Sequence, residues 1–191
     1  MSEPLLDIRN LRAGYRTPVV GPFSLQARAG EIIGLTGPNG CGKSTVLKAV
    51  TGEARIFDGH IERDTAAGIA LQAQSPATRG EIPLTGGELL RLMGHDGRGL
   101  PPRLDRLTRR RIDRLSGGQR QILAVWAVLY SGARLILLDE PGNNLDREGT
   151  ELLADALTAL PADRAVLMVS HEQHLVERVC HRVVDMEASA P

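Results

Sequence analysis

The feature that most constrains this chain is the glycine-rich run Gly37-Pro-Asn-Gly-Cys-Gly-Lys-Ser44. It matches the pattern G-x-x-x-x-G-K-[ST], and it lies between an apolar stretch at residues 31–36 and a helical pattern at residues 44–51. A loop in this position turns its backbone N–H groups inward, and the helix adds the positive end of its dipole. The sequence therefore predicts a phosphate-binding loop, and it disfavours a glycine-rich turn that only connects a strand to a helix.

We expect this loop to hold the phosphates of a nucleotide. Lys43 is predicted to contact the β- and γ-phosphates and Ser44 to ligate Mg²⁺. Lys43 and Lys48 are the only lysines, since every other basic residue is arginine. A compact ammonium reaches between phosphates in a way that the planar guanidinium does not, whereas Lys48 is predicted to lie on a helix surface. The residues expected to enclose the phosphates are Gly37, Pro38, Asn39, Gly40, Cys41, Gly42, Lys43, Ser44 and Thr45.

Two adjacent carboxylates, Asp139 and Glu140, follow the apolar segment 135–138. Open α/β sheets place their ligand-binding residues at such strand ends. Asp139 is the natural partner of Mg²⁺. Because successive strand residues face opposite ways, Glu140 can point toward the γ-phosphate and act as general base on the attacking water. The alternative is a strand that simply ends in acidic residues at the surface, and the phosphate-binding loop makes it the weaker interpretation.

The order of apolar segments predicts an α/β fold with a mainly parallel sheet covered by helices. A stretch from 75 to 114 interrupts the alternation with one helical pattern, at 87–93, and a Gly/Pro/Arg-rich segment, so we expect a helical insert that ends with the helix from Gly118. Predicted strands are 5–8, 31–36, 68–71, 135–138, 165–169 and 183–186, and predicted helices are 44–51, 118–130, 147–160 and 172–179.

Composition excludes several classes of protein. Basic and acidic residues number 23 each, so the net charge of zero gives no reason to expect nucleic acid as a partner. The longest strongly apolar run, 122–130, is far shorter than the ~20 residues of a membrane-spanning helix, and no secretory signal is apparent. Cys41 and Cys180 are expected to be free thiols. A length of 191 residues suits a single domain.

The segment Leu115-Ser-Gly-Gly-Gln119 narrows the interpretation. Together with the glycine-rich loop and the carboxylate pair, it makes the chain resemble the ATPase subunits of ATP-binding cassette (ABC) transporters, over nearly its whole length. The resemblance implies one ABC ATPase domain over 1–191. Its parts would be a RecA-like core with a small antiparallel β subdomain, at about 1–74 and 134–191, and a short helical subdomain at about 75–133.

In this family the Leu115–Gln119 segment acts across a dimer. Ser116 is a good N-cap, and the two glycines after it let a phosphate approach the first turn of the helix. The resemblance implies a head-to-tail dimer, either of two identical chains or of this chain with a second ABC subunit. Each ATP would then lie between the glycine-rich loop of one chain and the partner's Ser116, Gly117, Gly118 and Gln119.

The resemblance also assigns roles to four further residues. Tyr15 would stack on adenine, and Asp146, in the D-loop Asn144-Leu-Asp146, would lie at the dimer interface. His171 would contact the γ-phosphate as the switch histidine. Gln74 would touch Mg²⁺ and the water as the Q-loop glutamine, although Gln72 also fits that position.

Other features leave the family pattern or add to it. Gly142 stands where a threonine usually follows the proline after the carboxylate pair, which is expected to loosen the start of the D-loop. His171 and His174 lack a third ligand, so a zinc site there is disfavoured. Arginines at 103, 106, 109, 110, 111 and 114 form either a solvated helix face or a docking surface.

Three stretches, 59–63, 82–92 and 166–176, are most similar to ATPases of zinc and manganese importers. This implies an integral-membrane permease and a solute-binding protein as partners, with the chain peripheral on the cytoplasmic face of the cell membrane. The alternatives are a single-cassette export ATPase for haem, lipid or drugs, and a soluble ABC ATPase without a transport role. A small-molecule kinase is disfavoured because it has no use for the Leu115–Gln119 segment.

Overall fold

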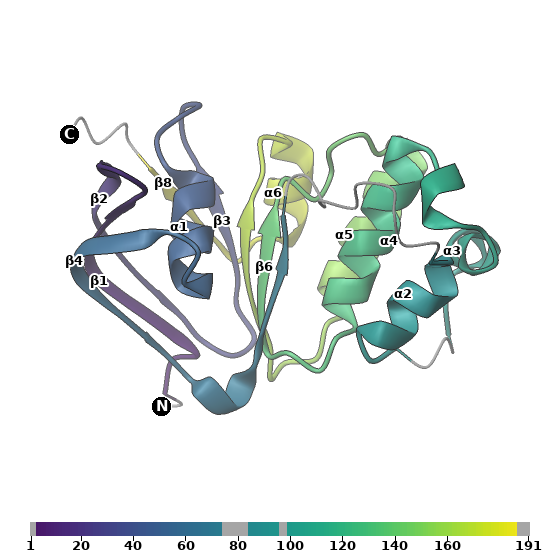
Figure 1. Cartoon of the computed structure of the whole chain (residues 1–191), viewed down its shortest axis with the longest axis horizontal. Coiled ribbons are helices and arrows are strands. Elements are labelled where there is room, and N and C mark those ends of the chain that lie inside the picture. The colour runs from purple at the N-terminus through teal and green to yellow at the C-terminus, as the bar shows by residue number, and fades with distance from the viewer. Residues whose placement is uncertain (1–2, 74–83, 96–98, 187–191) are drawn as a thin grey trace.

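A computed structural model describes residues 3–73, 84–95 and 99–186 of the chain. Two sheets with a helix between them form the left and centre of the molecule, and further helices cover the right side (Figure 1). The five-stranded parallel sheet has the order β5-β6-β7-β3-β8. Its strands are β3 (Ile32–Thr36), β5 (Ile69–Gln72), β6 (Leu135–Asp139), β7 (Ala165–Val169) and β8 (Arg182–Asp185).

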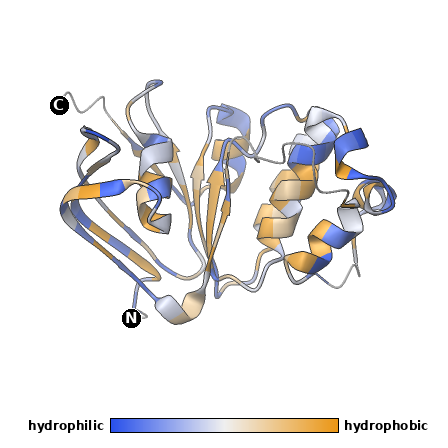
Figure 2. Ribbon diagram, viewed as in Figure 1, coloured by the Kyte–Doolittle hydropathy of each residue, from blue (hydrophilic) through white to orange (hydrophobic). Residues whose placement is uncertain are grey.

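Both faces of the central parallel strands are buried. Ile136 and Leu138 of β6 belong to the apolar core under the helices on one face, and Leu135 and Leu137 belong to the core on the other. This alternation follows from the two-residue period of a strand, and burial on both sides explains the continuous apolar runs in the sequence. Figure 2 shows these strands as predominantly hydrophobic. The predicted parallel, helix-covered α/β sheet is confirmed.

The second sheet is antiparallel, with the order β2-β1-β4. The sequence pattern located only the start of its middle strand, at residues 5–8. The other two strands are missed because their burial does not make an apolar run: the last strand is mostly exposed, with two partly buried residues and no fully buried one. The bounds are β1 (Leu6–Gly14), β2 (Pro18–Ala27) and β4 (Arg55–Arg63).

Helix α1 (Lys43–Thr51) lies between the two sheets and contacts strands of both. The opposite face of the parallel sheet is covered by the longer helices of the right side, which pack on one another (Figure 1). None of the helices within the described residues combines the length and apolar character needed to cross a membrane. The helices of the right side are α2 (Gly86–Leu92), α3 (Pro102–Thr108), α4 (Gly117–Leu129) and α5 (Arg147–Thr158), and α6 (Gln173–Val179) lies nearer the centre of the view and contacts α5.

Helix α3 lies inside the Gly/Pro/Arg-rich segment, where the sequence pattern predicted no helix. It begins with Pro102 in its first turn, and its buried residues are Leu104 and Leu107, three positions apart on one face. These two leucines join the core formed with α4. The helix is therefore amphipathic, with Arg106 exposed and Arg103 partly buried, and the right end of the molecule is strongly hydrophilic (Figure 2).

Candidate nucleotide-binding site

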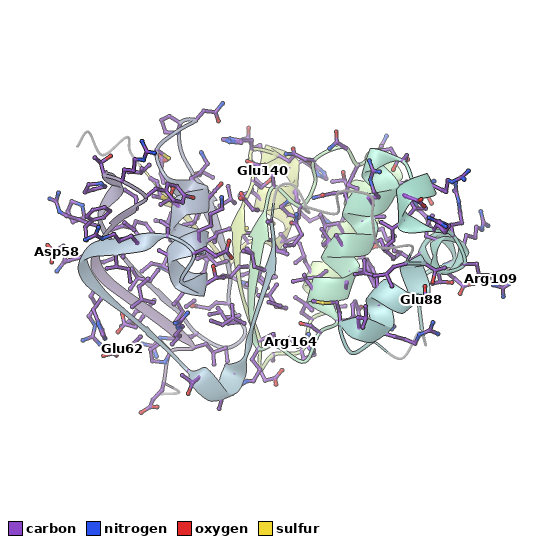
Figure 3. All side chains as sticks on the ribbon, viewed as in Figure 1. Asp58, Glu62, Glu88, Arg109, Glu140 and Arg164 are labelled. Atoms are coloured by element: carbon purple, nitrogen blue, oxygen red, sulfur yellow. The ribbon has the colours of Figure 1, made fainter. Side chains whose placement is uncertain are left out.

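Three neighbouring strands place the candidate site at one edge of the parallel sheet. The glycine-rich loop follows β3, Glu140 follows β6, and His171 follows β7, which lies between the other two. In Figure 3, Glu140 lies at the upper end of the strands and Arg164, which precedes β7, lies at the lower end. The carboxyl ends of parallel strands share an edge, so segments more than a hundred residues apart in sequence meet there.

The glycine-rich loop needs glycine at its junction with α1. Gly42, the N-cap of α1, has φ 98°, a conformation that disfavours side chains, and a Cβ there would lie 2.7 Å from Cβ of Val20. Lys43 is buried, and its Nζ donates hydrogen bonds to the carbonyl oxygens of Gly37 and Pro38, both at 2.8 Å. The ammonium thus lies inside the curve of the loop, where a phosphate would meet it.

Ser44, at the start of α1, and Asp139, at the end of β6, are hydrogen-bonded to each other. Ser44 Oγ donates a hydrogen bond to Asp139 Oδ1 at 3.0 Å. Burial raises the pKa of Asp139, while the hydrogen bond from Ser44 and the positive charges of Lys48 and Lys43 act in the opposite direction. A hydroxyl and a carboxylate are the hard oxygen donors that Mg²⁺ prefers, so this pair fits that ion.

Glu140 and His171 form a second pair beside the loop. His171 Nε2 lies 3.2 Å from Glu140 Oε1, and the His171 backbone N–H donates to Glu140 Oε2 at 3.3 Å. Burial raises the pKa of Glu140, and the neighbouring His171 partly offsets that rise. Glu140 also has φ 53°, a left-handed conformation that is costly for a residue with a side chain. The surrounding structure therefore holds this carboxylate against its backbone preference.

A cleft of about 390 Å³ connects these groups. It brings together Lys43, Ser44, Glu140 and His171, all predicted from sequence. Asp139 lies behind Ser44 and does not line it. The lining residues are Val19, Asn39, Gly40, Gly42, Lys43, Ser44, Thr45, Glu140, Val169 and His171.

Tyr15 lies at the turn between β1 and β2 and is 52% exposed. The ammonium of Lys48 lies 5.8 Å from the centre of its ring, within the range of a cation–π contact. Lys48 is therefore half-buried beside Tyr15, not simply a surface residue of α1. Stacking of Tyr15 on adenine stays a prediction.

The Leu115–Gln119 segment does not line this cleft. Ser116 caps α4: its hydroxyl accepts from the Gln119 backbone N–H at 3.2 Å, and Gln119 Oε1 accepts from the Ser116 N–H at 3.1 Å. Gly117 has open space around it, whereas Gly118 lies directly against the D-loop, so that a Cβ there would be 2.3 Å from the carbonyl oxygen of Asn144. The phosphate-contacting role of the segment stays a prediction.

Backbone hydrogen bonds and the Glu172 side chain lie at the start of the D-loop, around Gly142. Asn143 and Leu145 donate backbone hydrogen bonds to Glu140 and Gly142 at 3.2 and 3.0 Å. The carboxylate of Glu172 occupies the space that a larger residue at position 142 would need, because a Cβ there would lie 2.2 Å from Glu172 Oε1. The expected loosening of the loop by Gly142 stays a prediction.

Of the two candidate Q-loop glutamines, Gln74 lies outside the described residues. Gln72 ends β5 and is buried; its Nε2 donates to the carbonyl of Ala73 at 2.7 Å, and its Oε1 has no hydrogen-bond partner among the described residues. Gln72 is not among the residues that line the cleft.

Sequence reasoning missed a buried polar link between α4 and the carboxylate pair. Gln121 is 6% exposed, and its Nε2 donates to the carbonyl oxygens of Glu140 and Pro141 at 3.1 and 3.2 Å. The signal was an amide in the otherwise apolar part of a helix. Arg103, which contacts the N-cap Asp146, was assigned only to an arginine cluster. Arg103 and Asp146 are 43 residues apart in the sequence and meet only in the folded chain, so no local pattern predicts their contact.

Comparison with known proteins agrees with this geometry. The family model "ABC transporter" matches residues 20–143. A zinc import ATP-binding protein (ZnuC) of Roseobacter denitrificans (strain ATCC 33942 / OCh 114) is 32% identical over 192 residues, covering 96% of this chain and 75% of that protein.

Two solved structures share the fold. An ATP-binding subunit of an ABC transporter superimposes with a TM-score of 0.82 at 26% identity, covering 96% of this chain and 86% of that one. A protein described as an ABC transporter of the metal-chelate type, in an inward-facing conformation, has a TM-score of 0.76 at 23% identity, with coverages of 96% and 80%. The sequence match and the arrangement of the site together place the chain in the ABC transporter family, as one of its ATP-hydrolysing subunits.

Proposed function

We propose that this chain binds Mg²⁺ and ATP in the cleft between the glycine-rich loop and His171, and that hydrolysis there powers import of a metal ion of the zinc or manganese type. The observation that carries the catalytic part is the convergence of Lys43, Glu140 and His171 at the ends of three adjacent strands. The identity to a zinc import ATPase supports the choice of metal import over export of haem, lipid or drugs.

The proposed reaction is an in-line displacement. Water attacks the γ-phosphorus, the bond from that phosphorus to the bridging oxygen breaks, and ADP leaves with the electron pair. Glu140 accepts the proton of the water, and its raised pKa makes it a stronger base than an ordinary carboxylate. Lys43 neutralises the β- and γ-phosphates and His171 donates to the γ-phosphate. Ser44 and Asp139, with Gln74 as a further ligand, would hold Mg²⁺, which would supply positive charge against the phosphates.

The active form would be the head-to-tail dimer. Ser116–Gln119 and Asp146 do not line the chain's own cleft, which supports their action on the nucleotide of a partner subunit. Tyr15 would stack on adenine. The dimer would associate with an integral-membrane permease, peripheral on the cytoplasmic face of the membrane, and a solute-binding protein would deliver the metal.

Two experiments test the proposal. Glu140→Gln removes the base while keeping the shape of the side chain, so ATP should convert this variant from monomer to dimer on gel filtration, whereas ADP should not. A variant that stays monomeric with Mg²⁺ and ATP would refute the sandwich. Co-purification of the native complex, with identification of the permease and measurement of zinc and manganese uptake, tests the substrate; a complex that exports haem or lipid would refute metal import.

A further inference from the structure

Arg103, in the first turn of α3, joins the helical side of the molecule to the D-loop. Its Nη2 donates to the carboxylate of Asp146 at 2.9 Å and its Nη1 donates to Glu148 Oε2 at 2.9 Å. Its neighbour Leu104 is fully buried, so the backbone under the guanidinium is fixed. The arginine holds the pKa of Asp146 below its ordinary range, chiefly through the hydrogen bond between them.

Asp146 is itself a structural centre of the D-loop. Its Oδ1 accepts the Gly149 backbone N–H at 2.8 Å and so caps α5, while its carboxylate receives Arg103. On the opposite side of the loop, the carbonyl of Asn144 lies against Gly118 of α4. The D-loop is therefore held between α3 and α4, and these two helices pack on each other through buried leucines.

We propose that Arg103 is a positioning residue for the dimeric ATPase: it fixes the D-loop to the signature segment Ser116–Gln119, so that both reach the partner's nucleotide as one rigid unit. This inference rests on the head-to-tail dimer of the proposed function. It assigns a task to one member of the arginine cluster that the sequence left as either a solvated face or a docking surface.

Among the described residues, no other arginine of the cluster forms a hydrogen bond or ion pair with Asp146 or Glu148. Arg111 pairs with Asp113 two residues away, and Arg110 contacts Gln119 and the carbonyl of Arg114. Arg106, on the same helix as Arg103, is exposed and forms no hydrogen bond or ion pair with any described residue. It is the matched control, because its replacement removes the same charge from the same helix.

The geometry also explains why this residue is an arginine. The planar guanidinium meets two carboxylates at once, whereas the single ammonium of a lysine would engage them less completely. The carboxylates are largely exposed, with side-chain exposures of 64% and 78%, so the ion pairs add little to global stability. Their effect should appear in the geometry of the dimer and not in folding of the monomer.

The experiment uses the full chain with Glu140→Gln as parent. The ATP concentration that gives half-maximal dimer is measured by analytical ultracentrifugation for the parent, Arg103→Ala, Arg103→Lys and Arg106→Ala. The affinity of each monomer for ATP is measured separately, at protein concentrations below those that allow association. We expect Arg103→Ala to raise the ATP requirement about three- to tenfold, Arg103→Lys to be intermediate, and Arg106→Ala to match the parent, with monomer affinity unchanged throughout.

Four results would overturn the inference. If Arg103→Ala needs no more ATP for dimerisation than the parent, Arg103 does not position the D-loop. The same conclusion follows if Arg106→Ala raises the ATP requirement as much as Arg103→Ala does. If Arg103→Ala also weakens ATP binding by the monomer, or if the variant does not fold, Arg103 has a general structural role. The behaviour of Arg103→Lys then shows whether the charge or the size of the side chain matters. A parent that itself stays monomeric with ATP refutes the proposed dimer, which is a separate and recognisable failure.

Discussion

Two adjacent glycines at the start of α4 should respond in opposite ways to the same substitution. A Cβ on Gly118 would lie 2.3 Å from the carbonyl oxygen of Asn144, whereas a Cβ on Gly117 would meet nothing within 4 Å. An ordinary carbon–oxygen contact exceeds the first distance by about 1 Å, and a backbone carbonyl cannot swing aside as a long side chain can. Gly118→Ala must therefore separate the D-loop from α4.

The cost can be estimated from the structure. Overpacking a close contact lowers the free energy of unfolding by about 1–3 kcal/mol, and the higher helix propensity of alanine over glycine raises it by at most ~1 kcal/mol. We therefore expect Gly118→Ala to lower the free energy of unfolding by about 1–2 kcal/mol, or the melting temperature by roughly 3–6 °C for a chain of this length. Gly117→Ala should be neutral or slightly stabilising.

Urea unfolding can be followed through Trp126, the single tryptophan, which is 3% exposed in the native state. The two alanine variants are compared with the parent chain at the same pH and without nucleotide. If both variants unfold at the same urea concentration, the contact between Gly118 and the D-loop does not constrain the fold and the reasoning is wrong. If Gly117→Ala lowered the urea midpoint and Gly118→Ala did not, the steric argument would be contradicted more directly.

Three further outcomes are expected. Lys43→Ala should weaken ATP binding roughly 100-fold, because it removes charge-assisted hydrogen bonds to phosphate; calorimetric titration with an unchanged affinity would overturn the assignment of the loop. Burial raises the pKa of Glu140 in the folded state above its value in the unfolded chain. Ionisation of Glu140 therefore lowers the stability of the folded state as the pH rises from the lower of these two pKa values to the higher. Glu140→Gln should raise the melting temperature at pH 7, and this gain should vanish below about pH 4, where the carboxyl is protonated in both states. Gly142→Thr should change the free energy of unfolding by less than about 1 kcal/mol, because the Glu172 carboxylate that the new side chain meets is the end of a flexible side chain and can turn aside; a fall in the thermal unfolding temperature that Glu172→Ala in the same chain reverses would contradict this.

The parallel sheet could be predicted from sequence because its strands are buried on both faces. Segments such as residues 135–138 and 165–169 are then continuous apolar runs, which a pattern detects directly. The antiparallel strand β4 could not be found in this way, since most of its residues are exposed. Helix α3 was hidden by the glycines, prolines and arginines around it, although the spacing of Leu104 and Leu107 was a usable signal.

The residues of the candidate site also fall into two groups, those that a local sequence pattern indicates and those that it does not. Lys43, Ser44 and Glu140 belong to short motifs whose residues are adjacent in sequence, so the sequence indicated them. The contacts of Arg103 with Asp146, of Gln121 with the Glu140 carbonyl, and of Lys48 with the Tyr15 ring join separate elements. No local pattern specifies such pairs, because they exist only after the chain has folded.

The position of β7 between β6 and β3 has a consequence for the order in which the protein can form during its synthesis. Strands β3, β5 and β6 leave the ribosome before β7, but β6 and β3 pair with β7 and not with each other. Until residue 169 has emerged, the two halves of the cleft have no shared hydrogen-bonded strand to join them. The nascent chain is therefore expected to hold its glycine-rich loop and its carboxylate pair apart, and to become able to engage ATP only when its last third is made.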